Sequence, residues 1–389
     1  MTATSHPLVI VGAGLAGWTV AREFRKLDAT RSIVMVTSDS GDFYAKPTLS
    51  NAYAQKRTPE QLLTTPAQKM AETLQVELHA HTQVRRIDTQ AQKLTTHKGT
   101  EEQTLAYGQL VLASGAHPIR VPIEGDAADQ VRSVNHLADF AKFHAALGPA
   151  PKTVLVLGAG LIGCEFANDL VQGGYTVHVV DPATTALAAM LPSQASAQLR
   201  DALQGLGVVW HFGTTLQSLT HREGRMQAHL ANGELLIADL VLSAIGLRAD
   251  TALAQHSGLA CERGIVVSNT LQTSAKNVYA LGDCAQYASA QSRTLPYVMP
   301  IMNAARALVA TLHGTDTPVV FPVMPVSVKT PALPIVLVSP PPNAVGQWMQ
   351  EPDLDGAWRF VDDQGHARGF VLTGKQTSRR MELSKEIVL

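Results

Sequence analysis

Two glycine-rich loops are the residues of this chain whose spacing most clearly indicates chemistry. The segments GAGLAG at 12–17 and GAGLIG at 158–163 both follow the pattern G-x-G-x-x-G. The first glycine of that pattern makes a tight turn, the second lets the backbone approach a pyrophosphate, and the third lets a helix pack closely on a strand. The phosphate then lies at a helix N-terminus, which favours an anion. The sequence therefore predicts two dinucleotide sites, formed by Gly12, Gly14, Leu15, Ala16 and Gly17, and by Gly158, Gly160, Leu161, Ile162 and Gly163.

Acidic residues after the second strand of each unit are candidates to bind a ribose. Asp181 ends the strand that follows the second loop, and no arginine comes directly after it in VVDPATTAL. A carboxylate there accepts hydrogen bonds from ribose hydroxyls and repels a 2′-phosphate, which predicts a preference for NAD over NADP. In the first unit the candidates are Ser38 and Asp39. Asp39 either contacts the ribose or only caps a turn, and both interpretations stay open.

Two further acids have less obvious roles. Glu165 falls in the first turn of the helix after the second loop, beside the expected pyrophosphate. A helix N-terminus stabilises a carboxylate, although the charge of the ligand would repel it, so Glu165 is interpreted either as a capping residue or as a functional group. Asp283 in ALGDCA follows a strand and a glycine turn, where an aspartate can bind a ribityl hydroxyl of a flavin.

Each loop joins a strand to a helix, which is the context that pyrophosphate binding requires. In PLVIVGAGLAGWTVAREFRKL, a short apolar run precedes the loop and apolar residues recur at helical spacing after it. KTVLVLGAGLIGCEFANDLVQGGYTVHVVDP repeats this order about 146 residues later. So long a period argues against a solenoid and predicts two similar nucleotide-binding domains.

The segments after these units also carry signals of strands and turns. LVLASG ends at Gly115 and LVLSAIG ends at Gly246, and each reads as a sheet strand after which the chain leaves a domain. Asn232-Gly233 predicts a hairpin turn, and a helix is expected over about 301–312. Prolines punctuate short valine-rich strands from 321 to 342, which excludes a central parallel sheet and predicts a small separate domain.

Composition limits the class of protein. The chain has 389 residues, of which 46% are hydrophobic and 16% charged, so a large core is available. The formal net charge of −1 argues against a general nucleic-acid binder, and no apolar run approaches the roughly 20 residues of a membrane helix. The three cysteines are dispersed, which argues against a disulfide framework and a metal site. The N-terminus lacks the basic region of a signal peptide, so a cytoplasmic location is expected.

The motifs together resemble the FAD-dependent pyridine nucleotide–disulfide reductase superfamily from about residue 8 to 312. They are GAGLAG, ASG at 113–115, GAGLIG with Asp181, AIG at 244–246 and TSAKNVYALGD. A closer resemblance is to the rubredoxin–NAD(+) reductases, and it extends into the C-terminal segment. It lies in YAKPTLS (44–50), GAGLIGCEFANDL (158–170), YALGDCA (279–285), LPYVMP (295–300) and PVSVKTPALP (325–334).

The resemblance explains why one chain carries two loops. In the superfamily the first loop holds FAD and the second NAD(P)H, so that one nucleotide delivers a hydride and the other receives it. The resemblance also implies that Ala113 and Gly115 lie at the FAD and Gly246 at the NAD. Disulfide reductases carry reactive cysteines after the first nucleotide strand, whereas residues 41–55 contain none, which excludes thiol relay chemistry on this chain.

A lysine stands where the relay would be. In the resembling reductases, the residue that matches Lys46 lies against the isoalloxazine ring and pairs with the glutamate that matches Glu165. By the same resemblance, the Val84 backbone bonds the FAD adenine, and Val298 precedes a helix whose N–H groups face the flavin pyrimidine. Lys329 matches a lysine near the flavin, with an ordinary exposed strand lysine as the alternative.

We therefore expect an α/β fold with two Rossmann-like nucleotide-binding domains and a small α+β C-terminal domain. The FAD-binding domain would be discontinuous (1–117 and 246–316), with the NAD-binding domain (118–245) inserted into it. The C-terminal domain (317–389) would close the flavin site and contribute to acceptor docking. The resemblance implies hydride transfer from NADH to FAD, with Lys46 and Glu165 as the catalytic residues, and single electrons passed to rubredoxin for alkane hydroxylation.

Two alternatives for the function stay open. One is an NADH-dependent ferredoxin reductase of an oxygenase system, and the other is an NADH-sensing flavoprotein without turnover. Because rubredoxins are acidic, cations of the C-terminal segment could guide docking, or they could simply belong to a solvated helix; they are Lys329, Lys375, Arg379, Arg380 and Lys385. No metal ion, nucleic acid or direct membrane insertion is expected.

Overall fold

The protein is described by a computed structural model that covers residues 6–352 and 354–388. Its chain divides into two compact units, each built from three segments. The first unit comprises Met1–Ala45, Leu63–His117 and Leu247–Pro322, and the second comprises Lys46–Leu62, Pro118–Gly246 and Val323–Leu389.

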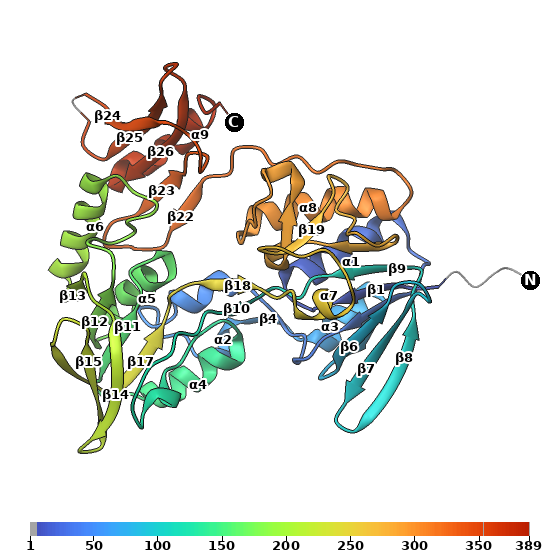
Figure 1. Cartoon of the computed structure of the whole chain (residues 1–389), viewed down its shortest axis with the longest axis horizontal. Helices are drawn as coiled ribbons and strands as arrows, with labels where there is room; N and C mark the ends of the chain where they lie inside the picture. Colours follow the sequence, from blue (N-terminus) through green and yellow to red (C-terminus); the bar gives the residue numbers. More distant parts are fainter. Residues whose placement is uncertain (1–5, 353, 389) are drawn as a thin grey trace, which may run out of the picture. The chain divides into compact units, whose positions relative to one another are not determined.

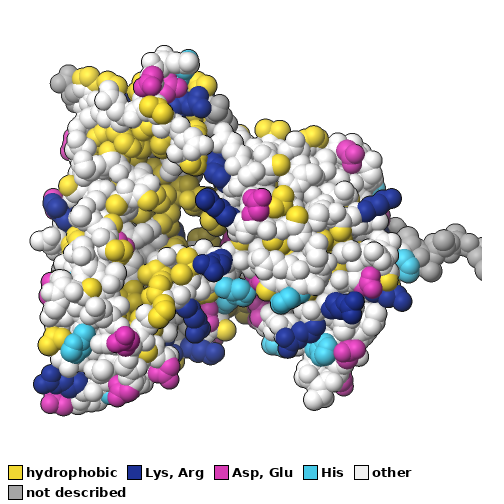
Figure 2. Space-filling view, in the orientation of Figure 1, with side chains coloured by type: hydrophobic (Ala, Val, Ile, Leu, Met, Phe, Trp, Pro, Cys, Tyr) yellow, Lys and Arg dark blue, Asp and Glu magenta, His cyan; other side chains and the backbone are white. Residues whose placement is uncertain are grey.

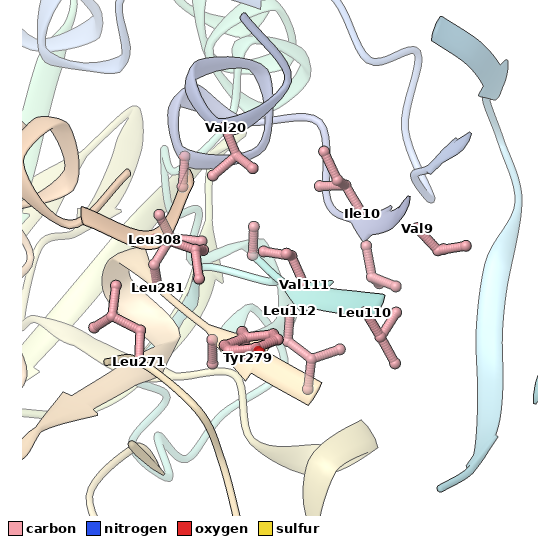
Figure 3. Packing of buried hydrophobic residues seen from close by; sticks show 14 of the residues in the cluster. Val9, Ile10, Val20, Leu110, Val111, Leu112, Leu271, Tyr279, Leu281 and Leu308 are labelled. Atoms are coloured by element: carbon pink, nitrogen blue, oxygen red, sulfur yellow. The ribbon is translucent and has the colours of Figure 1, made fainter. Parts of the chain in front are cut away.

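A five-stranded parallel sheet forms the centre of the first unit, in the order β20-β9-β1-β2-β5. Figure 1 labels its strands β9 and β1. Its strands are β1 (Leu8–Val11), β2 (Ile33–Val36), β5 (Val76–His79), β9 (Gln109–Leu112) and β20 (Val278–Ala280). Every residue of β1 and β2 is buried, the pattern of a parallel sheet covered on both faces. Figure 3 shows Val20 and Leu308 in one apolar cluster with Val111 and Leu281.

The helices of the first unit are α1 (Leu15–Leu27), α3 (Ala67–Leu74), α7 (Ala252–His256) and α8 (Val298–Leu312), with short 3₁₀ turns η3 (Gly282–Cys284) and η4 (Ala288–Ala290). An antiparallel sheet contains β6 (Gln83–Asp88), β7 (Lys93–Lys98) and β8 (Glu101–Ala106). Three small pairs complete the unit: β3 (Phe43–Tyr44) with β4 (Leu63–Thr65), β10 (Ala116–Pro118) with β18 (Leu247–Ala249), and β19 (Ile265–Val267) with β21 (Ala285–Tyr287).

The second unit contains a parallel sheet in the order β13-β12-β11-β17, made of β11 (Thr153–Leu157), β12 (Thr176–Asp181), β13 (Val209–Phe212) and β17 (Leu240–Ser243). An antiparallel sheet follows in β14 (Leu216–Arg222), β15 (Arg225–Leu230) and β16 (Leu235–Ala238). The helices are η1 (Lys46–Ser50), α2 (Pro59–Leu62), η2 (Ala128–Gln130), α4 (Leu137–Leu147), α5 (Leu161–Gln172) and α6 (Ser193–Gly205).

The C-terminal part of the second unit is an antiparallel sheet in the order β22-β23-β26-β25-β24 (Figure 1). Its elements are β22 (Val326–Val328), β23 (Ile335–Val338), β24 (Gly346–Gln350), β25 (Ala357–Asp362), β26 (Ala367–Thr373), η5 (Gly374–Arg379) and α9 (Arg380–Ser384). A small apolar core that includes Val336, Phe370 and Leu383 holds the helix on the sheet.

The two parallel sheets with their helices confirm the expected α/β fold. The Asn232-Gly233 turn is also confirmed, since it joins β15 to β16. Val298, however, is the first residue of α8 rather than a residue that precedes the helix; Pro300 lies in the first turn, where the missing N–H is tolerated. Residues 46–62, which the sequence placed in the FAD-binding domain, belong to the second unit, while the three-domain division itself stays a prediction.

Candidate functional site

The outer glycines of both loops are required by the packing of the chain itself. Gly12 has φ +108°, and a Cβ atom there would lie 2.2 Å from the carbonyl oxygen of Ala113. A Cβ atom on Gly17 would lie 1.9 Å from the carbonyl oxygen of Gly12. In the second loop, Cβ atoms on Gly158 and Gly163 would lie 2.8 Å and 1.9 Å from main-chain oxygens. These positions therefore admit only glycine.

The middle glycine of each loop is not required by the chain. Gly14 and Gly160 have φ −77° and −75°, and a Cβ atom at either position would meet no described atom within 4 Å. They are the N-caps of α1 and α5, and as glycines they supply no side-chain cap. Both loops thus leave space and main-chain N–H donors at the same point, as a bound pyrophosphate requires.

Asp181, at the end of β12, is held against the second loop. Its Oδ2 accepts the N–H of Ala159 at 2.6 Å, and its Oδ1 accepts the N–H of Ala183 at 2.7 Å. Each carboxylate oxygen has a second lone pair, so these bonds orient the acid and leave acceptors for ribose hydroxyls. Asp39 accepts the N–H of Gly41 at 2.9 Å, the bond of the turn-capping interpretation, and its contact with a ribose stays a prediction.

Glu165 lies on α5 with 0% of its surface exposed. The Ser50 hydroxyl donates to Oε2 at 2.6 Å, and the main-chain N–H of Lys329 donates to Oε1 at 2.9 Å. The Lys329 ammonium forms an ion pair with Oε2. One cation and two hydrogen bonds therefore stabilise the buried carboxylate, which explains how an acid is tolerated at this position.

Lys329 and Ser50 were not expected to be partners of Glu165. Lys329 was assigned to the neighbourhood of the flavin, with an exposed strand residue as the alternative; its side chain is 29% exposed and paired. Lys46 and Ser50 begin and end η1, so Lys46 shares a short helix with one Glu165 partner. The pairing of Lys46 with Glu165 stays a prediction.

The next turn of α5 continues this buried polar face. Asn168 and Asp169 are 1% and 2% exposed. Asn168 Oδ1 accepts the N–H of Ala332 at 3.1 Å, and the Asp169 carboxylate accepts the N–H groups of Tyr53 at 2.8 Å and Ala54 at 2.9 Å. Burial raises the pKa of the Asp169 carboxyl above its ordinary value, and these N–H groups act in the opposite direction. Sequence reasoning missed both residues: they lie in the segment GAGLIGCEFANDL at 158–170, which carried the family resemblance, but no role was assigned to either side chain.

All three cysteines are poor nucleophiles in this structure. Cys164 and Cys284 are fully buried, and burial raises the pKa of the Cys164 thiol and raises that of Cys284 to about 11. Burial also raises the pKa of the Cys261 thiol. Since the thiolate is the reactive form, the structure agrees with the absence of a thiol relay.

The remaining predicted residues lie in or next to the elements named below, and their roles stay predictions. They are Leu15 and Ala16 in α1, Ser38 after β2, Val84 in β6, Ala113 and Gly115 after β9, Asp283 in η3, Leu161 and Ile162 in α5, and Gly246 after β17. The described residues contain no cluster of three or more His, Cys, Asp or Glu that could hold a metal ion. None of the described helices has the length and apolar character needed to cross a membrane.

Some of the cations expected to guide an acidic acceptor form ion pairs with acids of the same chain. Besides the paired Lys329, Arg379 bonds Glu351 at 2.8 Å and Glu382 at 2.6 Å. Residues 323–389 contain seven Lys or Arg and seven Asp or Glu, and both kinds occur on the visible face of the C-terminal sheet, at the top of Figure 2. Arg379 is therefore neutralised by acids of its own domain and attracts a partner less than a free cation would.

Comparison with known proteins identifies relatives along the whole chain. The family model for pyridine nucleotide-disulphide oxidoreductases matches residues 6–307, and the model for a rubredoxin binding C-terminal domain matches residues 318–387. A rubredoxin-NAD(+) reductase of Alcanivorax borkumensis is 43% identical and one of Acinetobacter baylyi 42% identical; the alignments cover 98% of this chain and 98% and 97% of those proteins.

More distant relatives differ in the acceptor that their names state. A nitric oxide reductase FlRd-NAD(+) reductase of Aliivibrio fischeri is 36% identical over 98% of this chain and 99% of that protein. A solved ferredoxin reductase from Rhodopseudomonas palustris superposes with a TM-score of 0.88 over 99% of this chain and 96% of that one. It is 24% identical, and this similarity supports the fold alone.

Proposed function

Because the chain belongs to the pyridine nucleotide-disulphide oxidoreductase family, we propose that it is an FAD-dependent NADH:rubredoxin oxidoreductase. The observation that carries the proposal is the pair of loops that are open at their middle glycines, since each offers space and N–H donors to one pyrophosphate. The rubredoxin binding model over residues 318–387 and the two reductases of highest stated identity support rubredoxin as the acceptor.

The first loop would hold FAD. Gly14 leaves room for the pyrophosphate at α1, while Asp39 and Asp283 are the candidates for the ribose and ribityl hydroxyls. Val84 would bond the adenine through its backbone. Bound FAD supplies acceptance of a hydride and release of single electrons. The chain supplies binding and orientation, and burial makes the thiols of Cys164 and Cys284 poor nucleophiles for disulfide exchange.

The second loop would bind NADH as the substrate. Gly160 leaves room for its pyrophosphate, and the bond from Ala159 keeps the Asp181 carboxylate beside the loop. A 2′-phosphate would meet that carboxylate as a like charge, so NADH is the expected substrate rather than NADPH.

Lys46, Glu165 and Lys329 would set the electrostatics next to the reacting groups. Hydride transfer requires no protein acid or base, so these residues act by orientation and by the field they create. Glu165 anchors Lys329 through both its ammonium and its main-chain N–H. A lysine held in this way keeps its position without the entropy loss of a free side chain at each turnover.

The electron acceptor, the use of the electrons and the cellular location are each less firmly supported than the binding of the two nucleotides. A relative named for FlRd makes that protein a rival acceptor, and ferredoxin stays the rival acceptor that the sequence motifs left open. Alkane hydroxylation as the use of the electrons rests on the resemblance. A cytoplasmic location is proposed from the three dispersed cysteines, which are free thiols. An NADH-sensing protein without turnover would also bind both nucleotides, and steady-state kinetics separates it from an enzyme.

NADH oxidation by the purified holoprotein, with rubredoxin, ferredoxin or FlRd as acceptor, tests the function. We expect turnover with NADH, a kcat/KM at least tenfold lower with NADPH, and the highest kcat/KM for rubredoxin. Slow reduction of every acceptor despite rapid oxidation of NADH by ferricyanide would show that the acceptor is wrong. Failure to oxidise NADH with any acceptor would refute the enzyme.

A further inference from the structure

Helix α5 binds each of the two segments that supply the partners of Glu165 at two points. Ser50 donates to Glu165, and the N–H of Tyr53, three residues further along, donates to Asp169 on the next turn of α5. Lys329 binds Glu165, and the N–H of Ala332, three residues further along, donates to Asn168. The side chains at 165, 168 and 169 thus form one buried face that binds two segments from distant parts of the sequence.

These second contacts are well placed to fix backbone positions. Asp169 is 2% exposed and uses both carboxylate oxygens, one for Tyr53 and one for Ala54. Its N–H partners lie in a turn closed by the bond from Lys56 N–H to the Tyr53 carbonyl. The Tyr53 ring packs against Phe140 at a centroid distance of 5.4 Å. Segment 46–62 is therefore attached to α4 and α5 by apolar contacts and by a buried acid that allows little displacement.

We propose that Asn168 and Asp169 are positioning residues for the oxidoreductase: Asp169 fixes the register of segment 46–62 and thereby holds Ser50 on Glu165, and Asn168 does the same for Lys329. The proposal rests on the proposed function, in which Glu165, Lys46 and Lys329 lie near the flavin. Displacement of reacting groups by about 1 Å can cost up to ~100-fold in rate.

Asp169→Asn tests the first half. An amide has one acceptor oxygen and turns an NH₂ group toward a main-chain N–H, so one of the two bonds is lost. We expect faster hydrogen exchange at Tyr53 and Ala54, a roughly tenfold lower rate constant of flavin reduction at saturating NADH, and unchanged FAD content. Asp88→Asn is the matched control, because one oxygen of Asp88 accepts both of its N–H partners and an amide can keep them.

A double-mutant cycle distinguishes positioning from general loosening. In a Ser50→Ala background, Asp169→Asn should lower the reduction rate constant less than twofold further, since the bond it supports is already absent. Asn168→Ala should still lower the rate constant severalfold in that background, because it acts through Lys329. Equal losses from Asp169→Asn with and without Ser50 would overturn the proposal, and so would a wild-type rate constant together with faster exchange at Tyr53 and Ala54.

A main-chain variant covers the case in which Asp169→Asn does not fold. Ala54 is the second residue of the turn from Tyr53 to Lys56, where proline is favoured, so Ala54→Pro removes one N–H donor without changing α5. We expect the same fall in the rate constant of flavin reduction. Ala54→Ser keeps the N–H group and is the control, for which we expect no change in that rate constant. A wild-type rate constant in Ala54→Pro would overturn the proposal. Hydrogen exchange is measured without NADH, so the anchoring is tested even if the acceptor assignment fails.

Discussion

Alanine in place of the middle glycine separates ligand binding from folding at each loop. At Gly14 and Gly160 an added Cβ meets no described atom within 4 Å, and φ is −77° and −75°, so the native backbone suits alanine. Gly14→Ala and Gly160→Ala should therefore leave the apoprotein as stable as the wild type or up to ~1 kcal/mol more stable, because alanine restricts the unfolded chain. Gly17→Ala is the contrast: its Cβ would lie 1.9 Å from the Gly12 oxygen, and we expect no folded protein.

The same methyl group should obstruct the nucleotide. Inserting a methyl into a close contact costs about 1–3 kcal/mol, which corresponds to roughly 5- to 150-fold in affinity. Gly14→Ala should weaken FAD binding and leave NADH binding of reconstituted protein unchanged. Gly160→Ala should retain FAD and raise the dissociation constant for NADH.

Three measurements check this pair of variants. Thermal unfolding of the apoproteins reports the fold, equilibrium dialysis reports FAD affinity, and the NADH concentration dependence of flavin reduction reports the second site. Wild-type affinity for FAD in Gly14→Ala, or for NADH in Gly160→Ala, would show that the open space at the middle glycine is not the pyrophosphate site. Loss of both affinities in either variant would show that the loops are not independent.

Four other outcomes follow from the site and its surroundings. Asp181→Ala should reduce the preference for NADH over NADPH at least tenfold in kcat/KM, and unchanged selectivity would contradict the ribose assignment. Lys329→Met should lower the unfolding free energy by about 3 kcal/mol, because it removes a cation that is paired with the buried Glu165; adding Glu165→Gln should recover part of that loss in urea titrations. Glu351→Gln should lower the melting temperature of the holoprotein, because two arginines share this acid, whereas equal melting temperatures would mean that the network is solvated and weak. Burial, with a smaller contribution from a neighbouring histidine, lowers the pKa of His178 below its ordinary 6.5. The unfolded chain therefore binds the proton more readily, and the unfolding free energy should fall as pH drops below about 6.5. His178→Asn should reduce this dependence of the unfolding free energy on pH, and the same dependence in the variant and the wild type would refute the reasoning.

The sequence was most informative about features that residues close together in the chain specify. Each loop carries its own strand, turn and helix signal within about 30 residues, and Asn232-Gly233 specifies its hairpin locally. The partners of Glu165 could not be predicted in this way. Ser50 and Lys329 are 115 and 164 residues away from it, and only the packing of segment 46–62 and of the chain around 329–332 on α5 brings them together.

Helix boundaries show a second limit of sequence reasoning. The helix was expected to begin at about residue 301, whereas Pro300 lies inside α8, although proline lacks the N–H that an interior turn needs. In the first turn that N–H has no intrahelical acceptor, so α8 extends back to Val298. For Asp39 the structure shows the turn-capping bond from Gly41. A contact between Asp39 and a ribose depends on the bound ligand, and no sequence pattern at the end of this strand specifies it.

The three-segment construction of the first unit has a consequence for synthesis on the ribosome. Strands β1, β2, β5 and β9 are complete once Leu112 has been made, but their neighbour β20 and the helix α8 end at Ala280 and Leu312. At about 5–20 residues per second, the gap of roughly 200 residues lasts on the order of 10–40 s. During that time the apolar surface that Ala304, Ala305 and Leu308 later cover is exposed, while the sheet β13-β12-β11-β17 can already form from one continuous stretch. The parallel sheet that starts first is thus completed after the parallel sheet that starts second, and its nascent form is the expected client of chaperones.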